Sequence, residues 1–228
     1  MRVRQLTPNL IQLTRLRFVN AYLVREDDGF TLVDTTLPRG ADALYAAAAE
    51  EGAEIRRITL THGHGDHVGS LDALRKRLDR PVEVSMPETD ARIHAGEDVV
   101  DGKLPGSWPT LETKPDVLLR DGDRVGSLEV VAAPGHTPGH VAFLDPRDRS
   151  LIAGDVFTTF GGTAVTSHFT FPFPLTAMAT WSKELNLDSA RRLRGLEPTL
   201  LAVGHGPAVR DPEQETTRAI ERAHRALC

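Results

Sequence analysis

Residues 61–69 read Thr-His-Gly-His-Gly-Asp-His-Val-Gly, which places four side chains of metal-ligand type within six residues. The four are His62, His64, Asp66 and His67. Side chains two positions apart in an extended chain point the same way, so His62 and His64 can hold one ion. The glycines between them let the backbone fold closely around ions. A polar loop often holds one histidine, but three histidines with an aspartate at this spacing favour a metal site.

The segments on either side of this motif have different patterns. Ile55–Leu60 is a short apolar and β-branched run that leads directly into Thr61, as expected of a buried strand. Val68–Leu78 carries apolar residues at helical spacing. The motif is therefore expected where the end of a strand turns into a helix.

Three further ligand-type residues share one arrangement, because each follows an apolar strand-like run and has a glycine beside it. They are His136, Asp155 and His205. Strand ends meet at the edge of a sheet, so these side chains can meet the motif of residues 61–69 in space.

The remaining pattern alternates groups of strands with helices. Further strands are predicted at Asn9–Thr14, Phe18–Arg25, Phe30–Asp34, Val82–Val84, Val117–Leu119, Leu128–Ala132, His140–Leu144, Leu151–Ala153 and Leu200–Val203. Further helices are predicted at Ala41–Glu51, Pro87–Ala95, Thr176–Leu196 and after Asp211, which is the expected N-cap of the last helix. Gly96–Pro115 has little periodicity and is expected to be a loop insertion. This order favours one α/β domain over residues 1–228, a four-layer αββα sandwich of two mixed sheets flanked by helices.

Composition excludes several classes of protein. The net charge is −5, which argues against a general nucleic-acid binder. The single cysteine, Cys228, cannot build a disulfide framework or an iron–sulfur cluster. No segment reaches the roughly 18 apolar residues of a membrane helix, and the first ten residues lack the apolar core of a signal peptide. We therefore expect a cytoplasmic protein with neither a membrane nor a nucleic acid as its partner.

The ordered set of seven resembles the metallo-β-lactamase-fold hydrolase superfamily over about residues 10–210. That resemblance implies an αββα sandwich with a two-metal site at the sheet edges. Carried over position by position, it implies a first metal held by His62, His64 and His136. It implies a second metal held by Asp66, His67 and His205, with Asp155 bridging the two.

Imidazole and carboxylate ligands suit zinc, which is expected first, and also iron or manganese. Two ions about 3.5–4 Å apart can share a water and lower its pKa towards about 7, and the hydroxide can attack a carbonyl. Asp66 is expected to orient that hydroxide as the catalytic residue. The predicted function is therefore the hydrolysis of an ester-type bond in a small molecule, with a thioester or ester preferred.

The residue types that are present or absent at the ligand positions indicate which branch of the family this chain resembles. His64 stands where the flavodiiron oxidoreductases of this fold carry a glutamate, which points to hydrolysis. The best-known secreted zinc β-lactamases use a cysteine ligand, and no cysteine precedes Cys228. The chain is thus similar to the hydroxyacylglutathione hydrolase and lactonase-like branch, although only one helix's length follows His205. The alternatives are a lactonase, a mononuclear-iron persulfide dioxygenase and a metal-binding scaffold without catalysis.

Five of the eight phenylalanines lie in a 17-residue window just after Asp155. We expect residues 156–175 to form an active-site loop, with Phe157, Phe160, Phe169, Phe171 and His168 as candidate substrate contacts. A packed core segment or the contact of a homodimer is the alternative. Trp108 is a further candidate for the apolar wall.

Three other residues are weighed against ordinary structural roles. His140 is either a partner that orients a metal ligand or a histidine that hydrogen-bonds the strand. Tyr22 is expected in the core, and His94 is expected on a helix surface.

Overall fold

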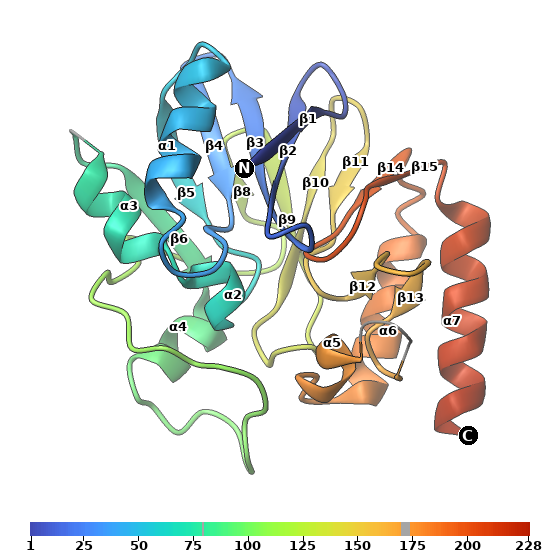
Figure 1. Ribbon diagram of the computed structural model, residues 1–228. Coiled ribbons are helices and arrows are strands. Elements are labelled where there is room, and N and C mark those ends of the chain that lie inside the picture. The colour runs from blue at the N-terminus through green and yellow to red at the C-terminus, as the bar shows by residue number, and fades with distance from the viewer. Residues whose placement is uncertain (79, 170–173) are drawn as a thin grey trace.

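The computed structural model describes residues 1–78, 80–169 and 174–228, and two mixed sheets stacked face to face form its centre (Figure 1). In spatial order the first sheet contains β1 (Arg2–Gln5), β2 (Leu10–Arg15), β3 (Val19–Glu26), β4 (Gly29–Val33), β5 (Ile55–Thr59), β6 (Glu83–Pro87) and β7 (Val117–Leu119). The strands β1 to β4 pair antiparallel, and β4 to β7 pair parallel.

The second sheet has the order β15 (Val209–Arg210), β14 (Leu200–Ala202), β11 (Ser150–Ile152), β10 (Val141–Asp145), β9 (Leu128–Ala132) and β8 (Arg124–Val125). Its pair β11–β14 is parallel and its other pairs are antiparallel. A separate hairpin pairs β12 (Phe157–Thr158) with β13 (Ala164–Val165).

Helices cover the outer faces of both sheets (Figure 1). The helices are α1 (Ala41–Glu50), α2 (Gly65–Val68), α3 (Leu71–Arg77), α4 (Glu88–His94), α5 (Leu175–Met178), α6 (Lys183–Arg194) and α7 (Glu213–Leu227). Three apolar clusters follow from these layers: the first sheet against α1 and α3, sheet against sheet, and the second sheet against α6 and α7. This arrangement confirms the predicted αββα sandwich.

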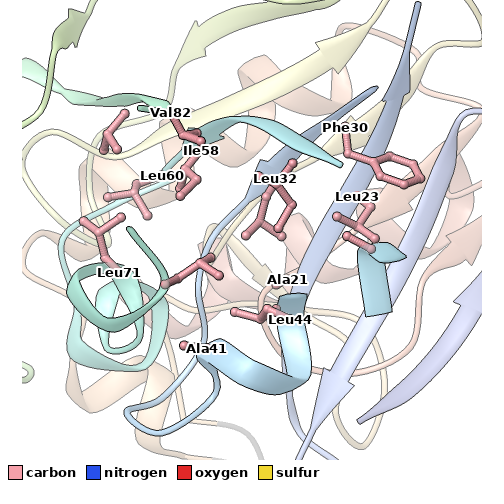
Figure 2. Packing of buried hydrophobic residues seen from close by; sticks show 14 of the residues in the cluster. Ala21, Leu23, Phe30, Leu32, Ala41, Leu44, Ile58, Leu60, Leu71 and Val82 are labelled. Carbon is pink, nitrogen blue, oxygen red and sulfur yellow. The ribbon is translucent and has the colours of Figure 1, made fainter. Parts of the chain in front are cut away.

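Successive side chains of β3 point to opposite faces of the sheet, so this one strand contributes residues to two of these clusters. Ala21 and Leu23 pack towards α1, whereas Tyr22 and Val24 pack between the sheets. Figure 2 shows Ala21 beside Leu44 of α1 and Leu23 next to Phe30, all within this outer cluster. Because both faces of the strand are covered, the sequence reads as an almost continuous apolar run.

Several predicted boundaries differ from the structure. The helix expected at Thr176–Leu196 is two helices, because Ser182 leaves the helical conformation and accepts the amide hydrogen of Leu185 as the N-cap of α6. The pattern at Val68–Leu78 is likewise divided between α2 and α3. Asp211 is not the N-cap of α7: its φ is 48° and its amide is bonded to Thr199 O, so the helix begins later.

Two further observations bear on the sequence expectations. Gly96–Pro115 contains neither helix nor strand, which agrees with the expected loop. Among the described residues, no helix has the length and apolar character needed to cross a membrane.

Candidate metal centre

Parallel strands bring two of the predicted ligands to one edge of the second sheet. β11 and β14 run side by side in the same direction. Asp155 and His205 follow these strands, so they emerge at the same edge.

Backbone hydrogen bonds join this edge to the first sheet. Val141 N donates to Thr61 O at 2.9 Å, and Asn20 N donates to Gly204 O at 2.8 Å. These bonds place the motif after β5 directly beside the loops of the second sheet.

The seven predicted ligand side chains come together here in three overlapping groups. Within each group, one donor atom of every residue lies within 4.8 Å of the others. The groups are His62–His64–His136, His62–His67–Asp155 and Asp66–His67–His205. Asp66 is partly exposed, and the other six side chains are buried.

Asp34 and Thr61 orient two of the histidines. His67 Nδ1 donates to Asp34 Oδ2 at 2.8 Å, and Thr61 Oγ1 donates to the same oxygen at 2.8 Å. The Thr61 hydroxyl is thereby left to accept from His62 Nδ1 at 3.0 Å. In their neutral forms both rings therefore carry the proton on Nδ1 and turn an Nε2 lone pair towards the cluster.

Hydrogen bonds of the same kind orient the other three rings. The contacts are His64 Nε2 to Pro105 O (3.2 Å), His136 Nδ1 to Thr180 Oγ1 (3.0 Å) and His205 Nδ1 to Phe18 O (3.1 Å). The Thr180 hydroxyl donates to Thr176 O at 2.9 Å, so it accepts from His136. All five rings thus present one nitrogen to the centre of the cluster.

Acceptor atoms face one another at that centre. His64 Nδ1 lies 3.1 Å from His136 Nε2, and Asp155 Oδ2 lies 3.4 Å from His136 Nε2 and 3.1 Å from His205 Nε2. Among the described residues, three buried atoms in the cluster have no hydrogen-bond partner: His62 Nε2, His67 Nε2 and Asp155 Oδ1. Such acceptors stabilise one another only when protons or metal cations lie between them, and nitrogen and carboxylate ligands suit zinc, iron or manganese. The residues present therefore fit divalent metal ions.

Burial keeps the first group of histidines neutral. It lowers the pKa of His62 and of His136 well below the usual value for histidine. It lowers the pKa of His64 to about 4. These three rings can accept a cation at neutral pH without first losing a proton.

Two other histidines are stabilised in the charged form when no cation is bound. Burial opposes the charge on His67 and His205, but carboxylates, Asp155 foremost, raise the pKa of His67 well above its usual value and that of His205 to about 9. Burial opposes the charge on Asp155 and Asp66 as well, yet the two histidines hold the pKa of both carboxyls below the usual range. A cation binding here must displace protons.

The cluster forms part of the wall of a cavity of about 440 Å³. The apolar part of the wall comes from separate segments and includes Phe18, Leu37, Pro38, Pro109, Leu111 and Leu175. Within the described part of the chain, no lysine or arginine lines this cavity.

The loop of residues 96–115 packs against His64, a member of the group His62–His64–His136. The Trp108 ring stands edge-on to His64, with 5.2 Å between the ring centroids, and Trp108 Nε1 donates to Pro105 O at 2.9 Å. A Cβ at Gly63 would lie 2.5 Å from the Trp108 ring. Only glycine therefore allows the loop to approach the motif this closely.

The aromatic residues after Asp155 do not line the cavity in the described part of the chain. Phe157 is 1% exposed and packs in the core beneath α6 and α7, while Phe160 borders a different cavity beside Gly206. Phe169 is 62% exposed, with Lys183 Nζ 5.4 Å from its ring centroid. The hairpin β12–β13 turns the start of the predicted active-site loop into the core, which is why the expected wall is made by other residues.

Two more candidate substrate contacts remain outside the cavity or outside the described chain. His168 lies beside Arg222 of α7, and burial together with that charge lowers the pKa of the imidazole. It does not line the cavity at the metal cluster. Phe171 lies outside the described residues.

His140 and Tyr22 have clear structural partners. His140 Nε2 accepts the amide hydrogen of Asp155 at 3.0 Å, and its ring stacks on His62 with 5.0 Å between centroids. His140 therefore orients a predicted ligand. Tyr22 is buried and donates its hydroxyl to Val203 O at 2.6 Å, which agrees with the expected core role.

Sequence reasoning missed three residues that support the site. Asp34 follows the apolar strand β4 as Asp155 follows β11, so the same pattern could have found it. Asp90 and His94 of α4 carry no such signal. His94 is not the surface residue that was predicted, because its Nε2 donates to Gly63 O at 2.8 Å and its ring packs on Trp108.

Comparison with known proteins gives a family model and several relatives that match this chain. The family model described as the metallo-β-lactamase superfamily matches residues 14–205. The chain is 41% identical over 211 residues to the uncharacterized protein YobT of Bacillus subtilis, with 90% of each chain covered. It is 30% identical over 219 residues to the probable metallo-hydrolase YflN of the same organism, covering 86% of this chain and 81% of that protein.

Longer enzymes and a solved structure also match. A hydroxyacylglutathione hydrolase of Rhodopseudomonas palustris is 33% identical over 144 residues, which is 61% of this chain and 48% of that enzyme. The crystal structure of TTHA1623 in a di-iron-bound form superposes with a TM-score of 0.65 at 30% identity, covering 91% of this chain and 96% of that one. These metallo-hydrolase homologues indicate a hydrolase. The chain belongs to the metallo-β-lactamase superfamily.

Proposed function

We propose that this protein is a hydrolase that uses two divalent metal ions to cleave an ester-type bond in a small molecule, with a thioester or ester preferred. The observation that carries the proposal is the convergence of seven ligand-type side chains, five of which line a cavity whose other walls are largely apolar. Two of the groups, His62–His64–His136 and Asp66–His67–His205, share no residue, and Asp155 lies between them.

Bound ions would supply an activated water and a Lewis acid for the carbonyl oxygen. Asp66 is the cluster residue best placed to act on that water. Its carboxylate is 32% exposed, and its Oδ2 lies 3.2 Å from His205 Nε2 and 3.9 Å from His67 Nε2. An exposed carboxylate oxygen at this position can orient a water and hold its proton.

The cavity wall favours an uncharged acyl group. Phe18, Pro38 and Leu175 offer apolar surface, and no basic side chain among the described residues lines the cavity. The bond that a hydroxyacylglutathione hydrolase cleaves is a thioester, which supports a thioester here. The carboxylates of glutathione itself would find no basic partner in this wall, so we propose a different leaving group.

Zinc is the metal we propose first, because five imidazoles and two carboxylates suit it. The di-iron-bound neighbour supports iron as the alternative. Manganese is compatible with the same donors.

A substrate panel tests the proposal. Chelator-treated protein should hydrolyse no activated thioester, aryl ester or lactone, and zinc, iron or manganese should restore turnover of the thioester and ester. Full turnover after chelation would refute metal dependence. Faster turnover of short- or long-chain lactones would favour a lactonase. Oxygen uptake with one iron per chain would favour a persulfide dioxygenase.

Metal analysis of two variants tests the ligand assignment. His62→Ala and Asp155→Ala should each bind fewer ions per chain than the parent, because each removes a donor from the cluster. His224→Ala is the matched control, since His224 is exposed on α7. Parental occupancy in His62→Ala or Asp155→Ala would contradict the assignment.

A further inference from the structure

One helix binds both backbone polar groups of a single residue, Gly63, inside the motif of residues 61–69. Gly63 N donates to Asp90 Oδ2 at 2.8 Å, and His94 Nε2 donates to Gly63 O at 2.8 Å. Asp90 and His94 are four residues apart in α4, so they lie on the same face of the helix. Gly63 stands between His62 and His64, so this contact fixes the backbone that carries both rings.

Asp90 also holds the loop that carries the third histidine. Thr137 Oγ1 donates to Asp90 Oδ2 at 2.7 Å, and Gly139 N donates to Asp90 Oδ1 at 2.7 Å. A Cβ at Gly139 would lie 2.6 Å from Asp90 Oδ1, which shows how closely the loop approaches the carboxylate. Asp90 is fully buried and accepts three hydrogen bonds, so its position is closely determined.

His94 links Gly63 to the cavity wall. Its Nδ1 lies 3.0 Å from Pro109 O, and its ring centroid lies 5.4 Å from that of Trp108. Both oxygen partners of His94 only accept, so a neutral ring donates to one of them at a time. The shorter of the two contacts is the one to Gly63.

The other half of the site is oriented by different residues. Asp34 binds His67, and Phe18 O binds His205. Within the ligand loops, the hydrogen bonds of Asp90 and His94 reach Gly63, Thr137 and Gly139, which are the sequence neighbours of His62, His64 and His136. α4 therefore contacts one half of the cluster selectively.

We propose that Asp90 and His94 are positioning residues that hold His62, His64 and His136 in place and so set the metal affinity of this group alone. The proposal rests on the metal-dependent function above. It predicts an asymmetric effect, because a general loss of fold stability would weaken both halves of the site together. Residues that orient metal ligands typically contribute about 10–100-fold in affinity.

Cobalt(II) titration in two backgrounds tests the proposal. His205→Ala should leave the three-histidine group as the main site, and His62→Ala should leave the group Asp66–His67–His205. Adding Asp90→Asn should weaken cobalt binding about 10–100-fold in the His205→Ala background and leave it unchanged in the His62→Ala background. The absorption bands of bound cobalt should report which ligands remain.

A second pair of variants separates geometry from fold. His94→Leu should weaken the same site, and His94→Gln, whose amide can still donate to Gly63 O, should restore much of the affinity. Arg92→Gln is the matched control on α4, because Arg92 is exposed and pairs with Glu97. Thermal unfolding of each variant without cobalt should show that the chain is folded.

Three results would overturn the proposal. Equal weakening of both backgrounds by Asp90→Asn would indicate a structural role only. Unchanged affinity in the His205→Ala background would show that Asp90 positions nothing. A parent chain that bound no cobalt would overturn the proposed function and this inference together.

Discussion

At the scale of single residues, the site is set by hydrogen bonds on the side of each ring away from the cluster. Asp34, Thr61 and Thr180 contact ligands without facing the centre. Each of them determines which nitrogen of a histidine is free. The result is a set of acceptor atoms that needs either protons or cations between them.

Protons and metal ions should therefore compete for His67 and His205. The pKa of His205 is about 9 and that of His67 is well above its usual value, so both rings are charged at pH 7 when no cation is bound. Metal binding at pH 7 should release about two protons from these rings, and metal affinity should fall as pH falls from 9 to 6. Calorimetry in buffers of different ionisation enthalpy measures this release. An affinity independent of pH over that range would contradict the prediction.

The same pKa shifts predict how pH changes the stability of the chain without metal. Because the pKa of His205 is raised from 6.5 to about 9, its ion pairs with Asp155 and Asp66 stabilise the fold fully below pH 6.5. This contribution is lost as pH rises through 9. Urea unfolding of the chelated protein at pH 6.5 and pH 9.5 should show the loss, and His205→Ala should remove it. An equal pH dependence in parent and variant would assign the effect to other groups.

A single methyl group should displace the carboxylate of Asp155. A Cβ at Gly204 would overlap Asp155 Oδ1 and lie 2.7 Å from His67 Cε1. Gly204→Ala should therefore lose metal ions, as measured by metal analysis. Gly195→Ala is the control, because the nearest atom to a Cβ there is 3.3 Å away. Parental metal content in Gly204→Ala would show that Asp155 does not bind the ions in this position.

At the scale of elements, the sequence predicted the strands and helices that have a regular pattern of apolar or helix-forming residues. It did not predict the strands that are too short or too exposed to show such a pattern. The strands β2 to β5 have alternating or continuous apolar residues, and α1 is rich in alanine, so local pattern was enough. The four residues of β1 are all exposed, and β8, β12, β13 and β15 have two residues each, so no sequence pattern marks these strands.

The same distinction applies to the site. The seven candidate ligands have a local signature of glycine and a preceding strand, and the structure brings them together. The residues that Asp90 and His94 bond in the ligand loops lie 27 to 49 residues away in sequence, so their role could not be read from α4 itself. The aromatic window suggested a substrate wall, but pairing of β12 with β13 took Phe157 into the core.

Helix α1 should contribute to stability and not to metal binding. Leu44 is fully buried in the cluster between α1 and the first sheet (Figure 2), so Leu44→Ala should reduce the free energy of unfolding by about 2–5 kcal/mol. Metal content should stay at the parental value. Leu185→Ala in α6, where the side chain is 41% exposed, should cost much less. Equal losses in urea unfolding would contradict the assigned packing.

At the scale of the whole molecule, the site lies where the two sheets are joined. His62 and His67 follow a strand of the first sheet, and Asp155 and His205 follow strands of the second. Neither sheet alone carries all seven ligand-type side chains. Because the ions bind the folded chain and not the unfolded one, metal should raise the temperature of unfolding in a concentration-dependent manner. An unfolding temperature that did not change with metal concentration would contradict a metal site built from the loops of both sheets.

The central claim is that this fold holds two divalent ions that are needed for hydrolysis of an ester-type bond. Metal analysis of the purified protein, combined with thioester turnover of the same sample during stepwise chelation and reconstitution, tests it most directly. We predict about two ions per chain, loss of turnover as they are removed, and recovery as they are replaced. Undiminished thioester turnover by a chain freed of metal would contradict the claim.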